Sequence, residues 1–211
     1  LPLLCTRPGV VTVHDLACAF HPQTAGLRAK LYYGTLVAQS VARARRIITV
    51  SQFCRQAIIR WFNVSPGEVV VAYPGVDPRF NPAVDAADVE ATRRKYGLPN
   101  DYILYVGQLG GRKNVESLID AYRILALRSF DLVLAGRTCS DTPRIIAHAA
   151  QADGAGRIRI IQNVDDRDLP TLYSGAALFA FPSVCEGFAL APLEAMACGT
   201  PVVSSNAEPL L

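Results

Sequence analysis

The chain has 211 residues, 51% of them hydrophobic and 18% charged, which predicts one large or two modest globular domains with hydrophobic cores. The net charge is +3 without a dense basic run, so a nucleic acid is not an expected partner. No apolar run reaches the length of a transmembrane helix or resembles a signal peptide, and we expect a cytoplasmic protein.

Six cysteines are scattered along the chain with no CxxC pair and no short spacing, which predicts reduced and mostly buried thiols. They are Cys5, Cys18, Cys54, Cys139, Cys185 and Cys198. We identify no Asp-x-Asp motif and no cluster of His and Cys residues with the spacing of metal ligands, and we expect neither a metal nor another cofactor. The single methionine is Met196, and we therefore interpret the chain as an internal fragment of a longer protein.

The first predicted strand, Val10–Val13, is followed directly by His14 and Asp15. Ligand groups in open parallel sheets gather at the carboxyl ends of strands, but a hydrogen-bonded loop pair is an equal interpretation of this His–Asp step. Apolar positions from Leu27–Val41 recur at helical spacing and predict an amphipathic helix. The basic cluster Ala42–Arg46 is typical of a solvated helix end, with contact to an anionic membrane surface as the alternative.

A second strand is predicted at Ile47–Ser51 and a helix at Gln52–Phe62. Ser51 immediately precedes this helix, and a serine at that position is a favoured N-cap. We expect Trp61 and Phe62 to pack into the core.

The segment after the third predicted strand, Val69–Ala72, changes in character. From residue 78 to residue 100 it carries prolines, several charges and one short predicted helix, Ala87–Tyr96. This pattern indicates an interdomain connection. The predicted organisation is a first domain at residues 1–80, a linker at 81–100 and a second domain at 101–211.

The second domain opens with a buried strand, Tyr102–Val106, followed by the glycine-rich loop Gly107–Asn114. Three glycines let the loop backbone approach a ligand closely. Arg112 and Lys113 follow them, just before a helix that is predicted to start near Val115. An arginine that donates two parallel hydrogen bonds and a lysine that acts as a point charge together suit a diphosphate.

Two further strands are predicted at Leu132–Gly136 and Arg157–Ile161, and a helix begins near Leu169. The residues that follow the second of these strands, Gln162–Val164, lie at a carboxyl end. Strand and helix thus alternate through both halves of the chain, which predicts two doubly wound parallel sheets.

Near the end of the chain a short strand, Leu178–Phe181, is followed by a loop and by a helix that Pro192 suits in its first turn and Gly199 ends. The free N–H groups at the start of this helix suit a phosphate. The carboxylates of Glu186 and Glu194 offer only acceptors, so hydroxyl groups are their expected partners. A nucleotide sugar has hydroxyls at both ends and a diphosphate between them. An ordinary strand–helix corner with two exposed glutamates is the alternative.

The run from Phe181 to Val203, in which seven residues separate Glu186 from Glu194, resembles the signature of the retaining glycosyltransferases of family 4, also called glycosyl transferases group 1. The resemblance implies an α/β fold of the GT-B type, in which two Rossmann-like doubly wound domains face a cleft. Both domains are expected to be incomplete in this chain.

The resemblance also implies roles for individual residues. It implies that Glu186 contacts the hydroxyls of the donor sugar, that His14 faces this sugar and that Glu194 holds the ribose. It implies that Arg112 and Lys113 neutralise the leaving nucleoside diphosphate, and that the end of the Arg157–Ile161 strand lies where the family holds the base. The remaining residues expected to bind the donor are Gly107, Gly187, Phe188, Ala189 and Leu190.

The chain departs from the family pattern at four positions. Ala189 stands where the family often has glycine, and Ala191 stands where it often has proline. Both replacements are small, so we expect a tolerable change in the loop. Gly110 and Gly111 stand where the family usually has other residues, in the loop before the two cations. The two cations themselves match the family pattern, but the sequence does not show whether a loop with these glycines holds them rigidly.

The expected activity is retaining transfer of a sugar, a hexose with mannose as one candidate, from a UDP- or GDP-linked donor to a glycan or lipid-linked acceptor. The resemblance implies front-face attack without a metal. Alternatives are an epimerase or phosphorylase on the same fold, or a module that binds a nucleotide sugar without turning it over. We expect the parent protein to be cytoplasmic, with peripheral contact at the inner membrane surface as an option.

Overall fold

The computed structural model describes residues 9–16, 32–125, 129–152 and 156–207. The chain forms two compact units. The first consists of Leu1–Gly75, Cys185–Ala189 and Ala207–Leu211, and the second of Val76–Val184 and Leu190–Asn206. Cys5, Cys18 and residues 27–31 of the helix expected at Leu27–Val41 lie outside the described residues, and the rest of that segment is helical.

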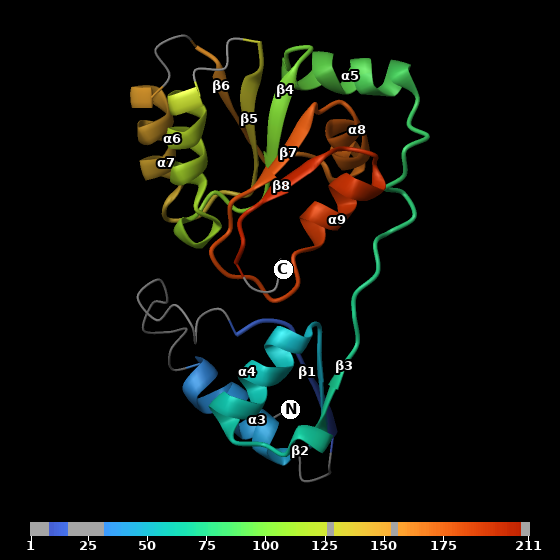
Figure 1. The fold of residues 1–211 in the computed structure, drawn as a ribbon, viewed down its shortest axis with the longest axis vertical. Helices are drawn as coiled ribbons and strands as arrows, with labels where there is room; N and C mark the ends of the chain where they lie inside the picture. Colours follow the sequence, from blue (N-terminus) through green and yellow to red (C-terminus); the bar gives the residue numbers. More distant parts are fainter. Residues whose placement is uncertain (1–8, 17–31, 126–128, 153–155, 208–211) are drawn as a thin grey trace. The chain divides into compact units, whose positions relative to one another are not determined.

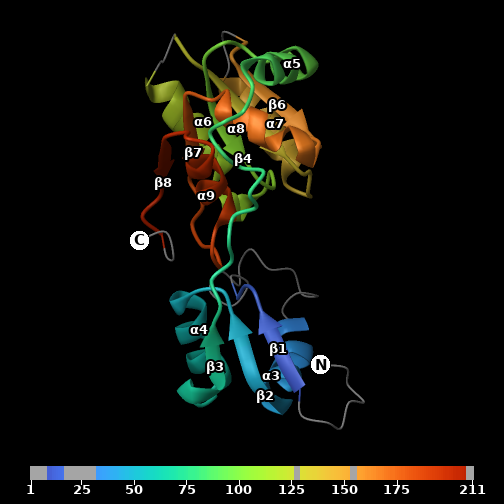
Figure 2. The same cartoon turned by 90° about the vertical axis from the view of Figure 1, so that its right-hand side faces the viewer.

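The first unit contains a parallel sheet of three strands in the order β1-β2-β3, which lie side by side in Figure 2. A π-helical turn, η1 (Tyr32–Val37), leads into α3, and a 3₁₀ turn, η2 (Pro66–Glu68), leads into β3. The strands and helices are β1 (Gly9–Val13), α3 (Ala38–Arg43), β2 (Ala44–Thr49), α4 (Gln52–Phe62) and β3 (Val69–Val71).

Strand residues and helix residues share one core in this unit. The buried cluster comprises Val13, Leu16, Val41, Ile47, Ala57, Ile58 and Val69. Thr49 is buried among them at the end of β2, and its hydroxyl donates to the carbonyl of Val13 at 2.8 Å. This bond satisfies a polar group that would otherwise be costly to bury.

Two expectations for the first unit need correction. The basic cluster is a solvated helix end only in its first part, because Ala42 and Arg43 end α3, whereas Arg45 and Arg46 are exposed on β2, which starts at Ala44. Pairing with β1, which brings Val10 opposite Arg46, extends the strand beyond its apolar residues. Trp61 is 53% exposed. Phe62 packs against the core instead, and Trp61 lies about 100° away around the helix.

The second unit is a five-stranded parallel sheet in the order β6-β5-β4-β7-β8. Its strands are β4 (Tyr102–Val106), β5 (Asp131–Gly136), β6 (Ile158–Gln162), β7 (Leu178–Phe181) and β8 (Val202–Ser204). Its helices are α5 (Ala86–Tyr96), α6 (Val115–Leu125), α7 (Thr142–Ala152), α8 (Leu169–Ser174) and α9 (Leu190–Ala197). Two 3₁₀ turns, η3 (Gly111–Lys113) and η4 (Asp166–Asp168), precede α6 and α8.

Helices cover both faces of this sheet. Ile103 and Tyr105 of β4 share a buried cluster with Ile119 of α6 and Ile145 of α7, and these two helices lie next to each other in Figure 1. On the other face, α8 contacts both α5 and α9. Strands buried on both faces explain the continuous apolar runs in the sequence.

The elements expected in this unit agree closely with the structure. Strand β7 has its expected bounds, and Gly199 ends α9 with φ +80°, a conformation that favours glycine. The helix α9 begins at Leu190, so Pro192 is its third residue. Among the described residues, no helix has both the length and the apolar character needed to cross a membrane.

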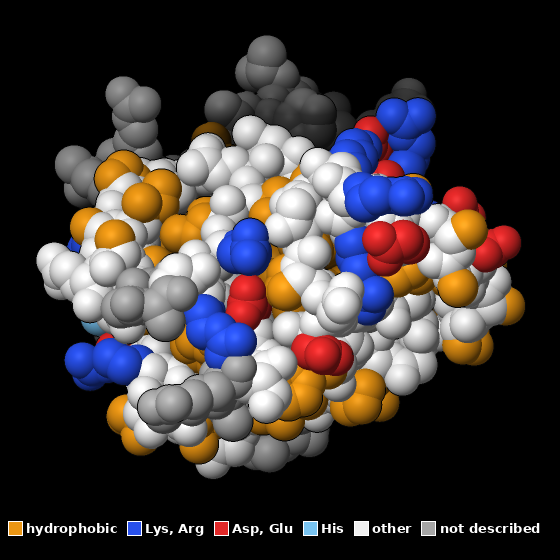
Figure 3. Space-filling view, turned by 90° about the horizontal axis from the view of Figure 1, so that it is seen from above, with side chains coloured by type: hydrophobic (Ala, Val, Ile, Leu, Met, Phe, Trp, Pro, Cys, Tyr) orange, Lys and Arg blue, Asp and Glu red, His pale blue; other side chains and the backbone are white. Residues whose placement is uncertain are grey.

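Charges of both signs meet where β5 begins. The carboxylate of Asp131 pairs with Arg157 and Arg159, each at 3.3 Å, and Arg159 also donates to the carbonyl of Gly97. Figure 3 looks onto the molecule from above, and basic and acidic side chains are interspersed on this face. No large area of a single charge forms among the residues described there.

Candidate functional site

Three neighbouring strands of the second unit end around a cavity of about 540 Å³. Because the sheet is parallel, the segments that follow β4, β5 and β6 meet at one edge, which is where such sheets bind ligands. The volume of this cavity falls within the range typical of small-molecule sites. The cavity is lined by Val106, Gly107, Gln108, Ala135, Gly136, Arg137, Thr138, Asn163, Val164, Asp166 and Leu169.

One of the lining residues, Gly136, has to be a glycine. A Cβ on Gly136 would lie 1.6 Å from the carbonyl oxygen of Gly107. The Gly107 N–H donates to Ala135 at 3.0 Å, and the Asn163 N–H donates to Gly136 at 3.1 Å. These bonds join the ends of three strands. Gly107 and Gly136 therefore approach each other closely, and both line the cavity.

The two expected phosphate ligands lie on a short turn beside this edge of the sheet. Arg112 and Lys113 belong to η3, which we call the cation turn, and Asn114 ends it with φ +54° before α6 starts. Both side chains are half-buried. The Lys113 ammonium lies 5.2 Å from the centre of the Phe181 ring, a cation–π geometry. The Arg112 carbonyl accepts from the N–H of Val184 at 3.2 Å.

The segment between β5 and α7 holds the glycines that precede these cations. Asp141 accepts a hydrogen bond from the N–H of Gly111 at 2.9 Å. Cys139 and Thr142 donate to the carbonyl of Leu109, at 2.9 Å and 3.1 Å. The cation turn is therefore anchored despite its glycines. Nothing in the sequence pattern singled out these three side chains, because a polar run before a helix reads simply as a cap.

Glu194 lies in the middle of α9 and is oriented by a buried tyrosine. The Tyr173 hydroxyl donates to Oε2 of Glu194 at 3.0 Å. Burial raises the pKa of Glu194, although this hydrogen bond and the charge of Arg79 oppose the shift. Tyr173 packs edge-on against Phe80 and Phe179, with ring centres 5.9 and 5.3 Å away. Nothing in the sequence distinguishes Tyr173 as a site residue, because an aromatic residue before an apolar strand is typical of a hydrophobic core.

Residues 185–189 of the signature loop are grouped with the first unit. The Gly187 carbonyl accepts from the Ser51 hydroxyl at 2.7 Å and from the Cys54 thiol at 3.4 Å. Ser51 also accepts from the N–H of Cys54 at 3.1 Å, which confirms it as the N-cap of α4. A Cβ on Gly187 would lie 2.3 Å from the carbonyl oxygen of His14. A glycine is therefore required here for packing, whatever its role toward a ligand.

The remaining signature residues differ in their environments. Glu186 is buried, with 6% of its surface exposed, whereas His14 and Leu190 are exposed. The Phe188 ring lies 6.2 Å from that of Tyr73. Ala189 has φ +67°, in the left-handed region that favours glycine. The departure from the family at this position therefore has a cost in backbone strain that the sequence analysis did not foresee.

The expected site residues are divided between the two units. The cavity with Gly107, the cation turn and Glu194 belong to the second unit, as does Leu190. His14 and Glu186 belong to the first unit, together with Gly187, Phe188 and Ala189.

One Asp-x-Asp spacing, Asp166-Arg167-Asp168, was missed when no metal was expected. The structure gives the two carboxylates different surroundings. Asp166 lines the cavity, whereas Asp168 accepts hydrogen bonds from Lys95 and Tyr96 of α5. Among the described residues, no three His, Cys, Asp or Glu side chains are grouped so that they could hold a metal ion.

Two known protein families match this chain, one in each half of the sequence. The family described as "Glycosyl transferases group 1" matches residues 88–211, which is more than half of the chain. The chain belongs to this glycosyltransferase family. The family described as "Glycosyltransferase Family 4" matches residues 2–80, in the first unit.

The curated relatives of this glycosyltransferase-family chain include enzymes named for O-antigen synthesis. It is 34% identical over 205 residues to the O-antigen chain mannosyltransferase B of Escherichia coli, covering 95% of this chain and 54% of the relative. It is 28% identical over 208 residues to the O-antigen chain mannosyltransferase RfbU of Salmonella typhimurium, covering 98% and 54%. The chain thus spans about half the length of these relatives.

Solved structures of other proteins superpose on this chain. The Anabaena protein Alr3699/HepE, determined in complex with UDP and glucose, superposes with a TM-score of 0.78 at 24% identity, covering 95% of this chain and 53% of that one. Sucrose-phosphate synthase from Thermosynechococcus elongatus superposes with a TM-score of 0.76 at 26% identity, covering 95% and 51%. The expected α/β fold of the GT-B type is confirmed.

Proposed function

We propose that the protein is a retaining glycosyltransferase that transfers a hexose from a nucleotide diphosphate sugar to an acceptor hydroxyl in glycan biosynthesis. The observation that carries the proposal is that one unit combines a cavity at three strand ends, an anchored turn with two cations and an oriented glutamate. The mannosyltransferase names of relatives support the class, and they make mannose the candidate sugar.

Within the second unit, each part of a nucleoside diphosphate has a chemically suitable partner. We assign the base to the cavity, whose apolar walls at Val106 and Val164 suit a planar ring. The ribose hydroxyls can donate hydrogen bonds to Oε1 of Glu194, while Oε2 accepts from the Tyr173 hydroxyl. Arg112 and Lys113 provide the positive charge for the diphosphate.

The proposed reaction breaks the bond between the anomeric carbon and a diphosphate oxygen. The acceptor oxygen bonds to the same face of that carbon, and its proton passes to the departing diphosphate. Negative charge develops on the leaving group, where cations already in position lower the barrier without a metal. By family resemblance, Glu186 and His14 orient the sugar, and the backbone of Gly187 and Phe188 lies near it.

A transfer assay tests the proposal directly. The protein that contains this chain is incubated with GDP-mannose or UDP-glucose and a mannose-terminated glycan, and the product is identified by mass and by its anomeric NMR signals. The proposal expects a product whose anomeric configuration equals that of the donor, and strongly reduced turnover in Lys113→Ala. An inverted product would refute the retaining mechanism. Binding without any transfer would favour the alternative of a binding module.

A further inference from the structure

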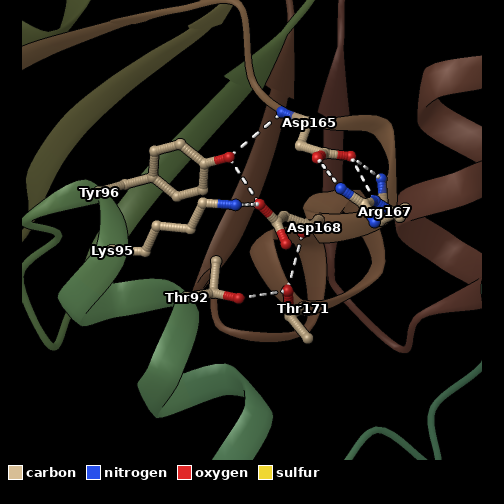
Figure 4. Close-up of polar contacts among 7 residues, drawn as sticks. All are labelled: Thr92, Lys95, Tyr96, Asp165, Arg167, Asp168 and Thr171. Atoms are coloured by element: carbon tan, nitrogen blue, oxygen red, sulfur yellow. Dashed lines mark hydrogen bonds and ion pairs between the residues drawn. The ribbon is translucent and has the colours of Figure 1, made fainter.

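One polar cluster of the second unit has no part in the proposed chemistry, yet it borders the cavity. It joins α5 to η4 and the start of α8, and we call it the clasp (Figure 4). Its members are Thr92, Lys95, Tyr96, Asp165, Asp168 and Thr171.

Asp168 is the centre of the clasp. Its Oδ2 accepts from the Lys95 ammonium at 2.5 Å and from the Tyr96 hydroxyl at 2.6 Å. The same hydroxyl accepts from the N–H of Asp165 at 3.2 Å, so Tyr96 ties two points of the chain to α5. In Figure 4 both the tyrosine ring and the lysine chain extend from α5 toward this turn.

A second contact lies one helical turn earlier on α5. The hydroxyls of Thr92 and Thr171 are 2.7 Å apart, and Thr171 donates in turn to the carbonyl of Asp168 at 2.8 Å. Thr92 is buried. The clasp therefore fixes both the side chain and the backbone of Asp168.

The segment that the clasp holds also forms one wall of the cavity. Asn163, Val164, Asp166 and Leu169 line the cavity, and the clasp residues Asp165 and Asp168 alternate with them along the chain. The contacts of the wall itself are local, because η4 is a single 3₁₀ turn that Asp165 caps and in which Asp165 pairs with Arg167. The clasp adds the contacts that join this turn to α5.

The hydrogen bonds and the ion pair of the clasp require Asp168 to be ionised, as it is near neutral pH. Burial acts to raise the pKa of Asp168, but the hydrogen bonds from Lys95 and Tyr96 outweigh it, and the pKa is lowered. The pKa of Asp168 is lower in the folded chain than in the unfolded chain. Asp168 therefore contributes fully to the stability of the fold above its unfolded pKa, and this contribution is lost as the pH falls through its folded pKa.

We propose that Lys95, Tyr96 and Asp168 are positioning residues that hold the wall of the cavity in the geometry that binds the nucleoside of the donor. The proposal rests on the function proposed above. The clasp acts through the wall residues, and the diphosphate is held by a different element, the cation turn. Loss of the clasp should therefore weaken binding of a nucleoside diphosphate and leave binding of a bare diphosphate unchanged.

Calorimetric titration of the protein with UDP, GDP and inorganic pyrophosphate tests this. Asp168→Asn should raise the Kd for the preferred nucleotide about fivefold. Tyr96→Phe removes two hydrogen bonds, one to Asp168 and one from Asp165, and should raise this Kd by at least as much. The Kd for pyrophosphate should be unchanged in both variants. Glu90→Gln is the matched control, because it removes an ion pair of α5 with Arg93 that lies outside the clasp.

The outcomes separate the two proposals. If the protein binds pyrophosphate but neither nucleotide, the proposed function fails and the role of the clasp fails with it. If it binds a nucleotide and both variants bind as tightly as the parent, the clasp is only structural and the function stands. Equal weakening of nucleotide and pyrophosphate binding would mean general destabilisation, and it would also overturn the proposal.

Discussion

Replacing Ala189 by glycine should stabilise the protein. Ala189 has φ +67°, and an alanine in this region costs about 1–2 kcal/mol because its Cβ crowds the following carbonyl oxygen. A glycine there removes this strain but gives the unfolded chain more freedom, which costs about 0.4–1 kcal/mol. The relief is the larger effect, so the free energy of unfolding should rise by about 0.5–1 kcal/mol.

A second alanine, two positions along the chain, is a matched control. Ala191 lies within α9 and does not have a positive φ, so glycine there relieves no strain. Ala191→Gly should lower the free energy of unfolding by about 0.5–1 kcal/mol. Both variants make the same chemical change, so the effect of the extra freedom of the unfolded chain cancels in their comparison. The remaining difference between them should be about 1–2 kcal/mol.

Urea denaturation followed by fluorescence, with melting temperatures in parallel, measures this difference. About 1 kcal/mol corresponds to a shift of about 2–4 °C for a chain of this size. We expect Ala189→Gly to melt above the parent and Ala191→Gly below it. If both variants lost the same stability, Ala189 would not be in the left-handed conformation and the strain argument would be refuted.

Three further predictions concern the second unit. Gly136→Ala should abolish nucleotide binding and lower the melting temperature sharply, because its Cβ would lie 1.6 Å from a backbone oxygen; normal binding by calorimetry would contradict this. Asp141→Ala should weaken pyrophosphate binding about fivefold by releasing the cation turn, whereas tighter binding would show that the carboxylate opposes the anion. Burial raises the pKa of Glu194, so nucleotide affinity should increase with pH through a midpoint above that of an ordinary glutamate. Tyr173→Phe should move this midpoint higher still, and Glu194→Gln should remove it; an unchanged profile in both variants would exclude Glu194 from the site.

Local signals made much of the fold predictable. The apolar run that became β7 and the serine that caps α4 depend on neighbours in sequence, and both were predicted at the observed positions. The sequence could not show that the backbones of Gly107 and Gly136 approach each other, because they follow different strands.

The features of the fold and of the site that were not predicted depend on contacts between distant parts of the chain. Asp141 holds the N–H of Gly111, and Tyr173 orients Glu194, across separations that no sequence period reveals. The extension of β2 into arginine-rich sequence follows from pairing with β1, which overrides local propensity.

Titration of the protein with UDP and GDP, repeated on Glu194→Ala and Lys113→Ala, tests the central claim most directly. The account predicts saturable binding of at least one nucleotide, weakened by both substitutions, with the preferred base narrowing the choice of donor. The parent and both variants should have similar circular dichroism spectra. A folded parent that binds neither nucleotide would contradict the account, as would binding that neither substitution affects.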